Sequence, residues 1–227
     1  MGAQPTWLET MWPKVRAHLP APPAAVVEVG CGSRGGFVPA LLAEGYETLG
    51  VDPQAPEGPV YRRSEIERTD LPVATDAVIA CTSLHHVADP AVALDRLAAA
   101  LAPDGTIIVI EWDWENFDEA SARWCFERLD AAQTDGWLYH TREHWLDSGL
   151  PWDDYLPAFA AEHGLHGARR LIGELDARFT RVSCNHGPYF FSDLAGMTEA
   201  DERLAIDAGE IRPLRIDYVG RAGATAG

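Results

Sequence analysis

The sequence has few basic residues, few cysteines and no long apolar run. Lysine and arginine number 18 against 35 aspartate and glutamate residues, which gives a formal net charge of −17 at pH 7. Proteins bind phosphate backbones through a basic surface, so this charge argues against a nucleic-acid substrate. No apolar run approaches the roughly 20 residues of a membrane-spanning helix, and no signal peptide is evident. We therefore expect a cytoplasmic protein that acts on neither membranes nor nucleic acids.

The cysteine pattern excludes further kinds of site. Cys31, Cys81, Cys125 and Cys184 lack the Cys-x-x-Cys spacing of many metal and redox sites, so they are predicted to be reduced, packed thiols. No metal is expected. A length of 227 residues suits a single domain, 1–227, that works as a monomer or homodimer.

The most informative stretch is 26–36, Val-Val-Glu-Val-Gly-Cys-Gly-Ser-Arg-Gly-Gly. Its valines favour a buried strand, and the glycines allow a sharp turn and a close approach to a ligand. A predicted helix closed by Gly45 follows, and a second predicted strand, 48–51, ends in Asp52. A carboxylate there can bind a ribose, so the pattern predicts a nucleoside-bearing cofactor. Dinucleotide-binding proteins share this pattern.

Glu28 favours a different cofactor from a dinucleotide. It lies within the predicted strand, two residues before Gly30, where a dinucleotide-binding strand normally carries apolar side chains. A carboxylate near the turn suits S-adenosylmethionine, which has an α-amino group and a sulfonium and no pyrophosphate for a helix N-terminus. The alternative is that Glu28 is a structural carboxylate.

The motif Glu-Val-Gly-Cys-Gly at 28–32 resembles the glycine-rich motif of class I S-adenosylmethionine-dependent methyltransferases. Residues 76–90 are similar to the family's fourth strand and the loop after it, and a helix at 91–101, a turn at 102–105 and a strand at 106–111 follow in the family's order. In that turn Asp104 replaces a glycine. The resemblance implies an α/β fold with a doubly wound, Rossmann-like seven-stranded sheet, mostly parallel with an antiparallel C-terminal strand, plus a small helical cap.

Positions around these motifs supply the candidate cofactor-binding residues. They are Glu28, Gly30, Cys31, Gly32, Asp52, Pro53, Glu65, Ile66, Cys81, Thr82 and His85. The resemblance places Glu65 and Ile66 beside the adenine and His85 in the wall of the cofactor pocket, with S-adenosylhomocysteine as the product. An NAD-dependent reductase is an alternative, although the chain lacks a Tyr-x-x-x-Lys motif and a separate substrate domain. A non-catalytic S-adenosylmethionine-binding protein is another.

Two segments lie outside the resemblance. A helix is predicted at about 6–19, either as a lid over the cofactor or as a cover for the sheet. A cap insertion is predicted at about 115–175, beginning with a long helix at 115–133 and continuing through a region rich in tryptophan and histidine. Beyond it, predicted strands at 179–184 and 214–219 flank an acidic helix at 198–208.

The acceptor site is predicted where the fifth strand meets the cap. Candidate acceptor contacts are Trp112, Trp114, His140 and Trp145, and His144 is the candidate catalytic base or polar contact. His140 and His144 share one helical face, but their order differs from the zinc motif His-Glu-x-x-His. Aromatic walls predict a small apolar or aromatic acceptor, methylated on oxygen, nitrogen or carbon.

Overall fold

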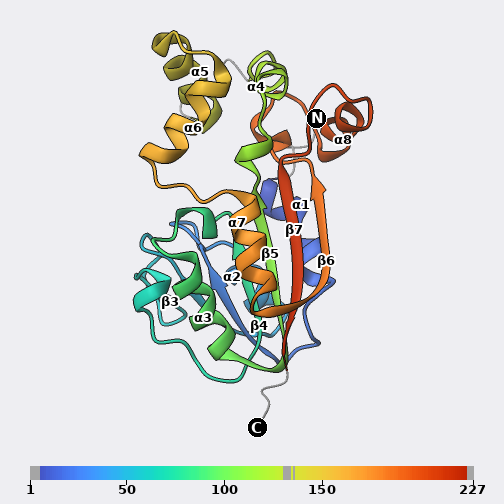
Figure 1. The fold of residues 1–227 in the computed structure, drawn as a ribbon. Helices are drawn as coiled ribbons and strands as arrows, with labels where there is room; N and C mark the ends of the chain where they lie inside the picture. The colour runs from blue at the N-terminus through green and yellow to red at the C-terminus, as the bar shows by residue number, and fades with distance from the viewer. Residues whose placement is uncertain (1–5, 130–133, 135, 224–227) are drawn as a thin grey trace.

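The structure is a computed structural model that describes residues 6–129, 134 and 136–223. Within these residues, seven strands form one sheet in the order β3-β2-β1-β4-β5-β7-β6 (Figure 1). The strands are β1 (Ala25–Val29), β2 (Glu47–Val51), β3 (Tyr61–Arg62), β4 (Thr75–Cys81), β5 (Leu101–Trp112), β6 (Phe179–Gly187) and β7 (Arg215–Ala222). Strand β7 is antiparallel to both β5 and β6, and the other pairs are parallel. The predicted fold class is confirmed.

The topology places a crevice between β1 and β4. The chain builds β1, β2 and β3 toward one edge and then adds β4 on the other side of β1. In open α/β sheets, ligands bind beyond the carboxyl ends of the strands at the point where the strand order reverses. The loops that follow β1 and β4 therefore occupy the expected position for a binding site.

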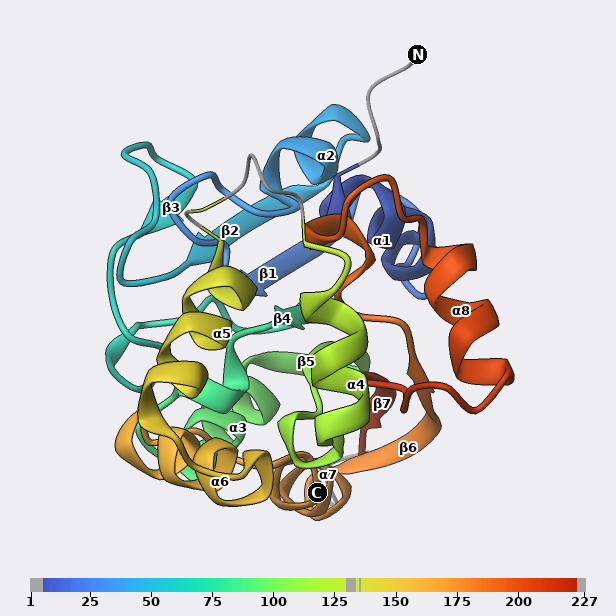
Figure 2. The same cartoon turned by 90° about the horizontal axis from the view of Figure 1, so that it is seen from above.

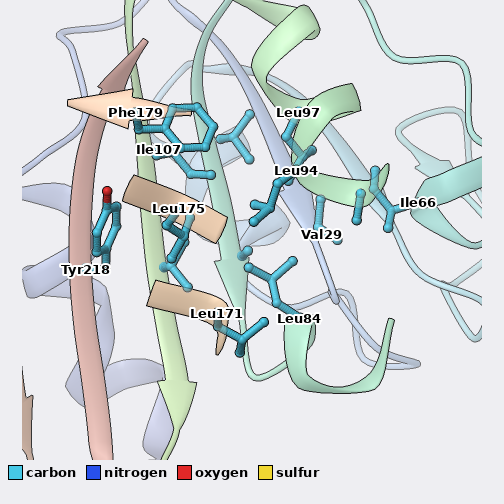
Figure 3. Packing of buried hydrophobic residues seen from close by; sticks show 14 of the residues in the cluster. Val29, Ile66, Leu84, Leu94, Leu97, Ile107, Leu171, Leu175, Phe179 and Tyr218 are labelled. Atoms are coloured by element: carbon cyan, nitrogen blue, oxygen red, sulfur yellow. The ribbon is translucent and has the colours of Figure 1, made fainter. Parts of the chain in front are cut away.

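Helices cover both faces of the sheet because neighbouring strand residues point to opposite faces. On one face, Val26 and Ile79 pack in a cluster with residues of α1 (Trp7–Arg16) and with Phe37 and Leu41, at the start of and within α2 (Val38–Ala43). On the other face, the alternate strand residues pack with α3 (Pro90–Ala100) and α7 (Ala168–Asp176). Figure 3 shows the side chains of this second cluster.

The cap is shorter than the predicted 115–175. Leu171 and Leu175 of α7 lie in the sheet core with Phe179 and Tyr218, at the four-residue spacing of one helical face (Figure 3). Helix α7 therefore covers the sheet. The helices of the cap are α4 (Glu119–Phe126), α5 (Trp137–Ser148) and α6 (Trp152–Glu162). Figures 1 and 2 show them beyond the end of the sheet to which β5 runs.

The predicted long helix at 115–133 also differs from the structure. A 3-10 turn occupies Trp114–Asn116, and Asp118 then starts α4 by accepting the N–H of Ser121 at 2.9 Å. Helix α4 ends at Phe126, and 130–133 lie outside the described residues.

The helices at the two ends of the chain follow the predicted starts. Helix α1 begins with a capping box between Thr6 and Glu9, and α8 (Glu199–Asp207) begins with one between Thr198 and Asp201. None of the described helices is long and apolar enough to cross a membrane.

Candidate active site

The glycine-rich turn after β1 is built from left-handed backbone. Gly30, Gly32 and Gly36 have φ values of 84°, 60° and 54°. A Cβ on Gly30 would lie 2.2 Å from Cβ of Ser83, which follows β4, whereas a Cβ on Gly32 would meet nothing within 4 Å. The turn is therefore packed against the β4 loop on one side and open on the other.

Glu28 supports the turn from within the fold. Its side chain is buried. Both carboxyl oxygens accept a hydrogen bond from the backbone N–H of Phe37, with the nitrogen 2.9 Å from Oε1 and 2.8 Å from Oε2. Burial raises the pKa of Glu28 to about 8. A Cβ on Gly36 would lie 2.1 Å from Glu28 Oε1, so the carboxyl group fills the space beneath the turn. The structure thus agrees with a structural role for Glu28.

A cavity of about 450 Å³ opens along this turn, and we call it the glycine-turn cavity. Seven predicted cofactor residues line it: Gly30, Gly32, Asp52, Pro53, Glu65, Ile66 and Thr82. Asp52 follows β2, and its Oδ1 accepts the N–H of Gln54 at 2.7 Å. The cavity is also lined by residues that the sequence did not assign to the cofactor, namely Val29, Val51, Ser64, Glu67, Ser83, His86, Val87 and Ala88.

The other four predicted cofactor residues lie elsewhere. Glu28, Cys31 and Cys81 are buried and are not among the described residues that line the glycine-turn cavity. His85 lines a neighbouring cavity instead. That these four take part in cofactor binding stays a prediction.

The neighbouring cavity, of about 620 Å³, lies between the strand ends and the cap, and we call it the aromatic cavity. Of the predicted acceptor residues, Trp112, His140 and His144 line it. Thr82 and His85, which the sequence assigned to the cofactor, line it as well. The sequence assigned no acceptor contact to the other lining residues, namely His86, Trp137, Thr141, Tyr155, Phe159, His163, Leu165, Tyr189, Phe190 and Asp193. Several of them lie on the facing sides of α5 and α6.

Trp114 and Trp145 are not among the described lining residues, so their predicted acceptor contacts are not supported. Trp145 packs against Phe126 and Trp152, and its Nε1 donates to the carbonyl of Leu150 at 2.9 Å. Trp114 is half-buried against the aromatic cluster of the cap. Both side chains therefore hold the cap together.

The two cavities meet at the end of β4. Thr82 and His86 line both of them. Thr82 has a φ of 48°, and its N–H donates to the carbonyl of Ile110 at 2.7 Å, which fixes the first residue beyond the strand. The glycine-turn cavity and the aromatic cavity are therefore neighbours on either side of the loop that follows β4.

Comparison with known proteins decides the family. Residues 6–169, most of the chain, match the methyltransferase-domain family. This chain is a member of that family. Its fold is that of the class I S-adenosylmethionine-dependent methyltransferases, and the predicted cofactor, S-adenosylmethionine, is confirmed. The NAD-dependent alternative is thereby set aside.

Individual relatives of this chain differ in their named substrates. A ubiquinone biosynthesis O-methyltransferase of Rhodopseudomonas palustris (strain HaA2) is 26% identical over 170 residues, which cover 66% of this chain and 59% of the relative. A tRNA U34 carboxymethyltransferase of Hahella chejuensis (strain KCTC 2396) is 37% identical over 119 residues, which cover 43% of this chain and 35% of the relative. The chain therefore spans well under two thirds of either relative.

A solved structure extends the likeness to the whole fold. The crystal structure of an S-adenosylmethionine-dependent methyltransferase from Mesorhizobium loti aligns with a TM-score of 0.58 at 20% identity, over 93% of this chain and 97% of the other. Family and fold together do not select between small-molecule and nucleic-acid acceptors, because one relative is named for a tRNA.

Histidines gather in the aromatic cavity. Those that line it are His85, His86, His140, His144 and His163. The Nδ1 of His144 lies 3.2 Å from the hydroxyl of Tyr155, and the Nδ1 of His85 lies 2.5 Å from Oε2 of Glu111. Burial lowers the pKa of His86 to about 4 and raises that of Asp193 to about 6. The described residues contain no cluster of three or more acidic, histidine or cysteine side chains able to hold a metal.

Proposed function

We propose that this chain transfers the methyl group of S-adenosylmethionine to a small aromatic or apolar metabolite. The observation that carries this proposal is the meeting of the glycine-turn cavity and the aromatic cavity at Thr82 and His86. A binding protein without activity needs only the first cavity. An enzyme needs the second, because the methyl group has to meet an acceptor beyond the strand ends.

The glycine-turn cavity fits the cofactor chemically. Gly32 presents bare backbone, so a ligand can approach closely where a side chain would intrude. In the proposed arrangement Asp52 accepts hydrogen bonds from the ribose, and Glu65 and Ile66 lie beside the adenine. Bound S-adenosylmethionine supplies an electrophilic methyl group on a sulfonium. The chain's own task is to hold the acceptor atom about 3 Å from that methyl group and to exclude water.

The aromatic cavity fits a flat acceptor. The ring of Trp112 lies 4.8 Å from that of Trp137, nearly at right angles, and 6.3 Å from that of Tyr189, at an interplanar angle of 19°. A volume of about 620 Å³ lies within the usual range for small-molecule sites. We assign Trp112 as one wall of the acceptor site and His144 as a polar contact within it.

Charge favours a small molecule over a nucleic acid. Among the described residues that line the two cavities there is no lysine or arginine, and the chain carries a net charge of −17. Contacts with a phosphate backbone need such cations. The four free cysteines favour the proposed cytoplasmic location, where thiols stay reduced.

The test is a methylation assay with S-adenosylmethionine and a panel of aromatic metabolites, read by mass spectrometry for the ~14 Da that a methyl transfer adds. Unmodified tRNA and polar, non-aromatic metabolites serve as parallel acceptors. We expect a mass gain only on aromatic or apolar small molecules. Methylation of tRNA alone would refute the acceptor class, and tight binding of S-adenosylhomocysteine without any turnover would favour a binding protein.

A further inference from the structure

A buried histidine–carboxylate pair lies at the wall of the aromatic cavity, where His85 lines the cavity next to His86 in the chain. His85 belongs to the 3-10 turn Leu84–His86 after β4, and Glu111 lies near the end of the adjacent strand β5. Their side chains are only 6% and 1% exposed, and Nδ1 of the histidine lies 2.5 Å from Oε2 of the glutamate. The other glutamate oxygen accepts the backbone N–H groups of Ser83 and Leu84 at 2.7 and 2.6 Å. The carboxylate is therefore fixed by the backbone that carries the histidine.

This hydrogen-bond pattern determines which nitrogen of His85 can take up a proton. A carboxylate can only accept, so the hydrogen of the short contact lies on Nδ1, and Nε2 carries the free lone pair. Nε2 makes no hydrogen bond with any described residue, and His85 lines the aromatic cavity. In many enzymes a histidine takes the proton of the nucleophile, and a third side chain, here the carboxylate, orients that histidine.

The other histidines of the cavity are less suited to this task. His86 is kept neutral by burial and by its neighbour His85, whose ring centroid lies 4.0 Å away. His144 pairs with the hydroxyl of Tyr155, and Nδ1 of His163 lies 2.9 Å from the carbonyl of Phe159. Among the described residues, only His85 in this cavity has a carboxylate partner within hydrogen-bond distance.

We propose that His85 is the general base of the methyl transfer, that Glu111 is its positioning residue, and that the acceptor is an aromatic hydroxyl. This inference rests on the proposed function. The acceptor's O–H proton passes to Nε2 of His85 while an oxygen electron pair forms the new O–C bond. The C–S bond to the methyl group breaks, and its electron pair stays on sulfur. Glu111 stabilises the imidazolium, which then releases the proton to water.

A hydroxyl explains the pair better than an amine does. The lone pair of a neutral amine attacks without prior loss of a proton, whereas a phenol is a strong nucleophile only as the phenolate. A base next to the acceptor therefore has its largest effect on weakly acidic hydroxyl groups. The aromatic walls around Trp112 select the ring that carries such a hydroxyl.

The experiment compares catechol with the more acidic 4-nitrocatechol in the wild type and in His85→Ala. We expect kcat/KM for catechol to fall about 100-fold or more in the variant, with a much smaller loss for 4-nitrocatechol, because that acceptor ionises without help. Added imidazole should restore part of the catechol activity. His18→Ala, an exposed histidine outside both cavities, is the matched control.

Glu111→Gln tests the positioning role. The amide presents an N–H to Nδ1 of His85, which moves the ring hydrogen to Nε2 and removes the base while keeping the shape. We expect its catechol activity to fall. In both His85→Asn and Glu111→Gln, kcat/KM for catechol should rise only at the higher pH at which catechol itself ionises. Other titratable groups around His85 are His86, His140, His144, Tyr155, His163, Tyr189 and Asp193, and the two variants keep all of them.

Several outcomes would overturn the inference. They are equal losses of kcat/KM for the two catechols in His85→Ala, an unchanged pH profile of kcat/KM in the variants, or full catechol activity in His85→Asn. His85→Asn also replaces His85→Ala in the comparison if the alanine variant fails to fold. Wild-type methylation of aromatic amines without methylation of any hydroxyl would refute the acceptor class and leave the methyltransferase function intact. Binding of S-adenosylhomocysteine, measured by calorimetry, should be the same in all variants, which separates this test from that of the cofactor site.

Discussion

Replacing Trp112 with alanine should separate acceptor binding from cofactor binding. The side chain is 4% exposed and lies in the cap cluster, where its ring meets those of Phe117, Trp137 and Phe190. A buried tryptophan replaced by alanine costs about 3–5 kcal/mol of unfolding free energy. We expect kcat/KM for the acceptor to fall tenfold or more, about 1.4 kcal/mol, while the affinity for S-adenosylhomocysteine stays nearly constant.

Trp145→Ala is the control for this prediction. Trp145 is 7% exposed in the same cluster, so its loss should destabilise the cap by a similar amount, but it does not line the aromatic cavity. Thermal unfolding, calorimetry with S-adenosylhomocysteine and steady-state kinetics would be measured on both variants. Equal losses of acceptor activity in the two variants, or a parallel loss of cofactor affinity in Trp112→Ala, would refute the assignment of Trp112 as an acceptor wall.

Three further predictions concern the glycine-turn cavity and the buried carboxyl group beneath its turn. Asp52→Ala should weaken S-adenosylhomocysteine binding by about 1.5–3 kcal/mol, the range for hydrogen bonds to a charged group; an unchanged dissociation constant in calorimetry would mean that Asp52 does not hold the ribose. In calorimetry with S-adenosylhomocysteine and in thermal unfolding, Gly30→Ala should lower cofactor affinity or stability more than Gly32→Ala does. Only the alanine at position 30 adds a Cβ that clashes with Ser83. The reverse order would contradict the packing of the turn. Burial raises the pKa of Glu28 from 4.5 to about 8. Between these pH values the folded state holds a proton that the unfolded state has lost. The contribution of Glu28 to stability is therefore present at low pH and is lost as the pH rises through this window. Across that window, the unfolding free energy of the wild type should fall relative to that of Glu28→Gln by up to about 1.4 kcal/mol per pH unit. Parallel plots of unfolding free energy against pH for the two proteins would show that Glu28 does not titrate there.

Local patterns in the sequence predicted the sheet and seven of the described residues that line the glycine-turn cavity. Runs of valine and isoleucine mark strands, and Gly30, Gly32 and Asp52 follow two of them directly, so their positions at the carboxyl edge depend on chain order alone. The partner of Glu28 could not be predicted from the sequence. The residues next to Glu28 do not reveal that the N–H of Phe37, nine residues later, donates a hydrogen bond to its carboxyl group.

The aromatic cavity depends on contacts that sequence spacing does not reveal. On α5, His140 and His144 line the cavity. Trp145 is one residue further along the helix, so its side chain is rotated by about 100° and packs in the cap cluster instead. The pairing of His85 with Glu111 joins residues 26 positions apart on neighbouring strand ends. Only the strand register brings them together, so the sequence assigned His85 to the cofactor and His144 to the chemistry.

In the proposed function, cofactor and acceptor occupy adjoining cavities that meet at Thr82 and His86. Transfer of a deuterated methyl group from labelled S-adenosylmethionine to an aromatic acceptor, followed by mass spectrometry of the product, tests it most directly. We predict a product that carries all three deuterium atoms, formed by the wild type and reduced tenfold or more in Trp112→Ala. A protein that binds S-adenosylhomocysteine but labels no aromatic small molecule would contradict the claim.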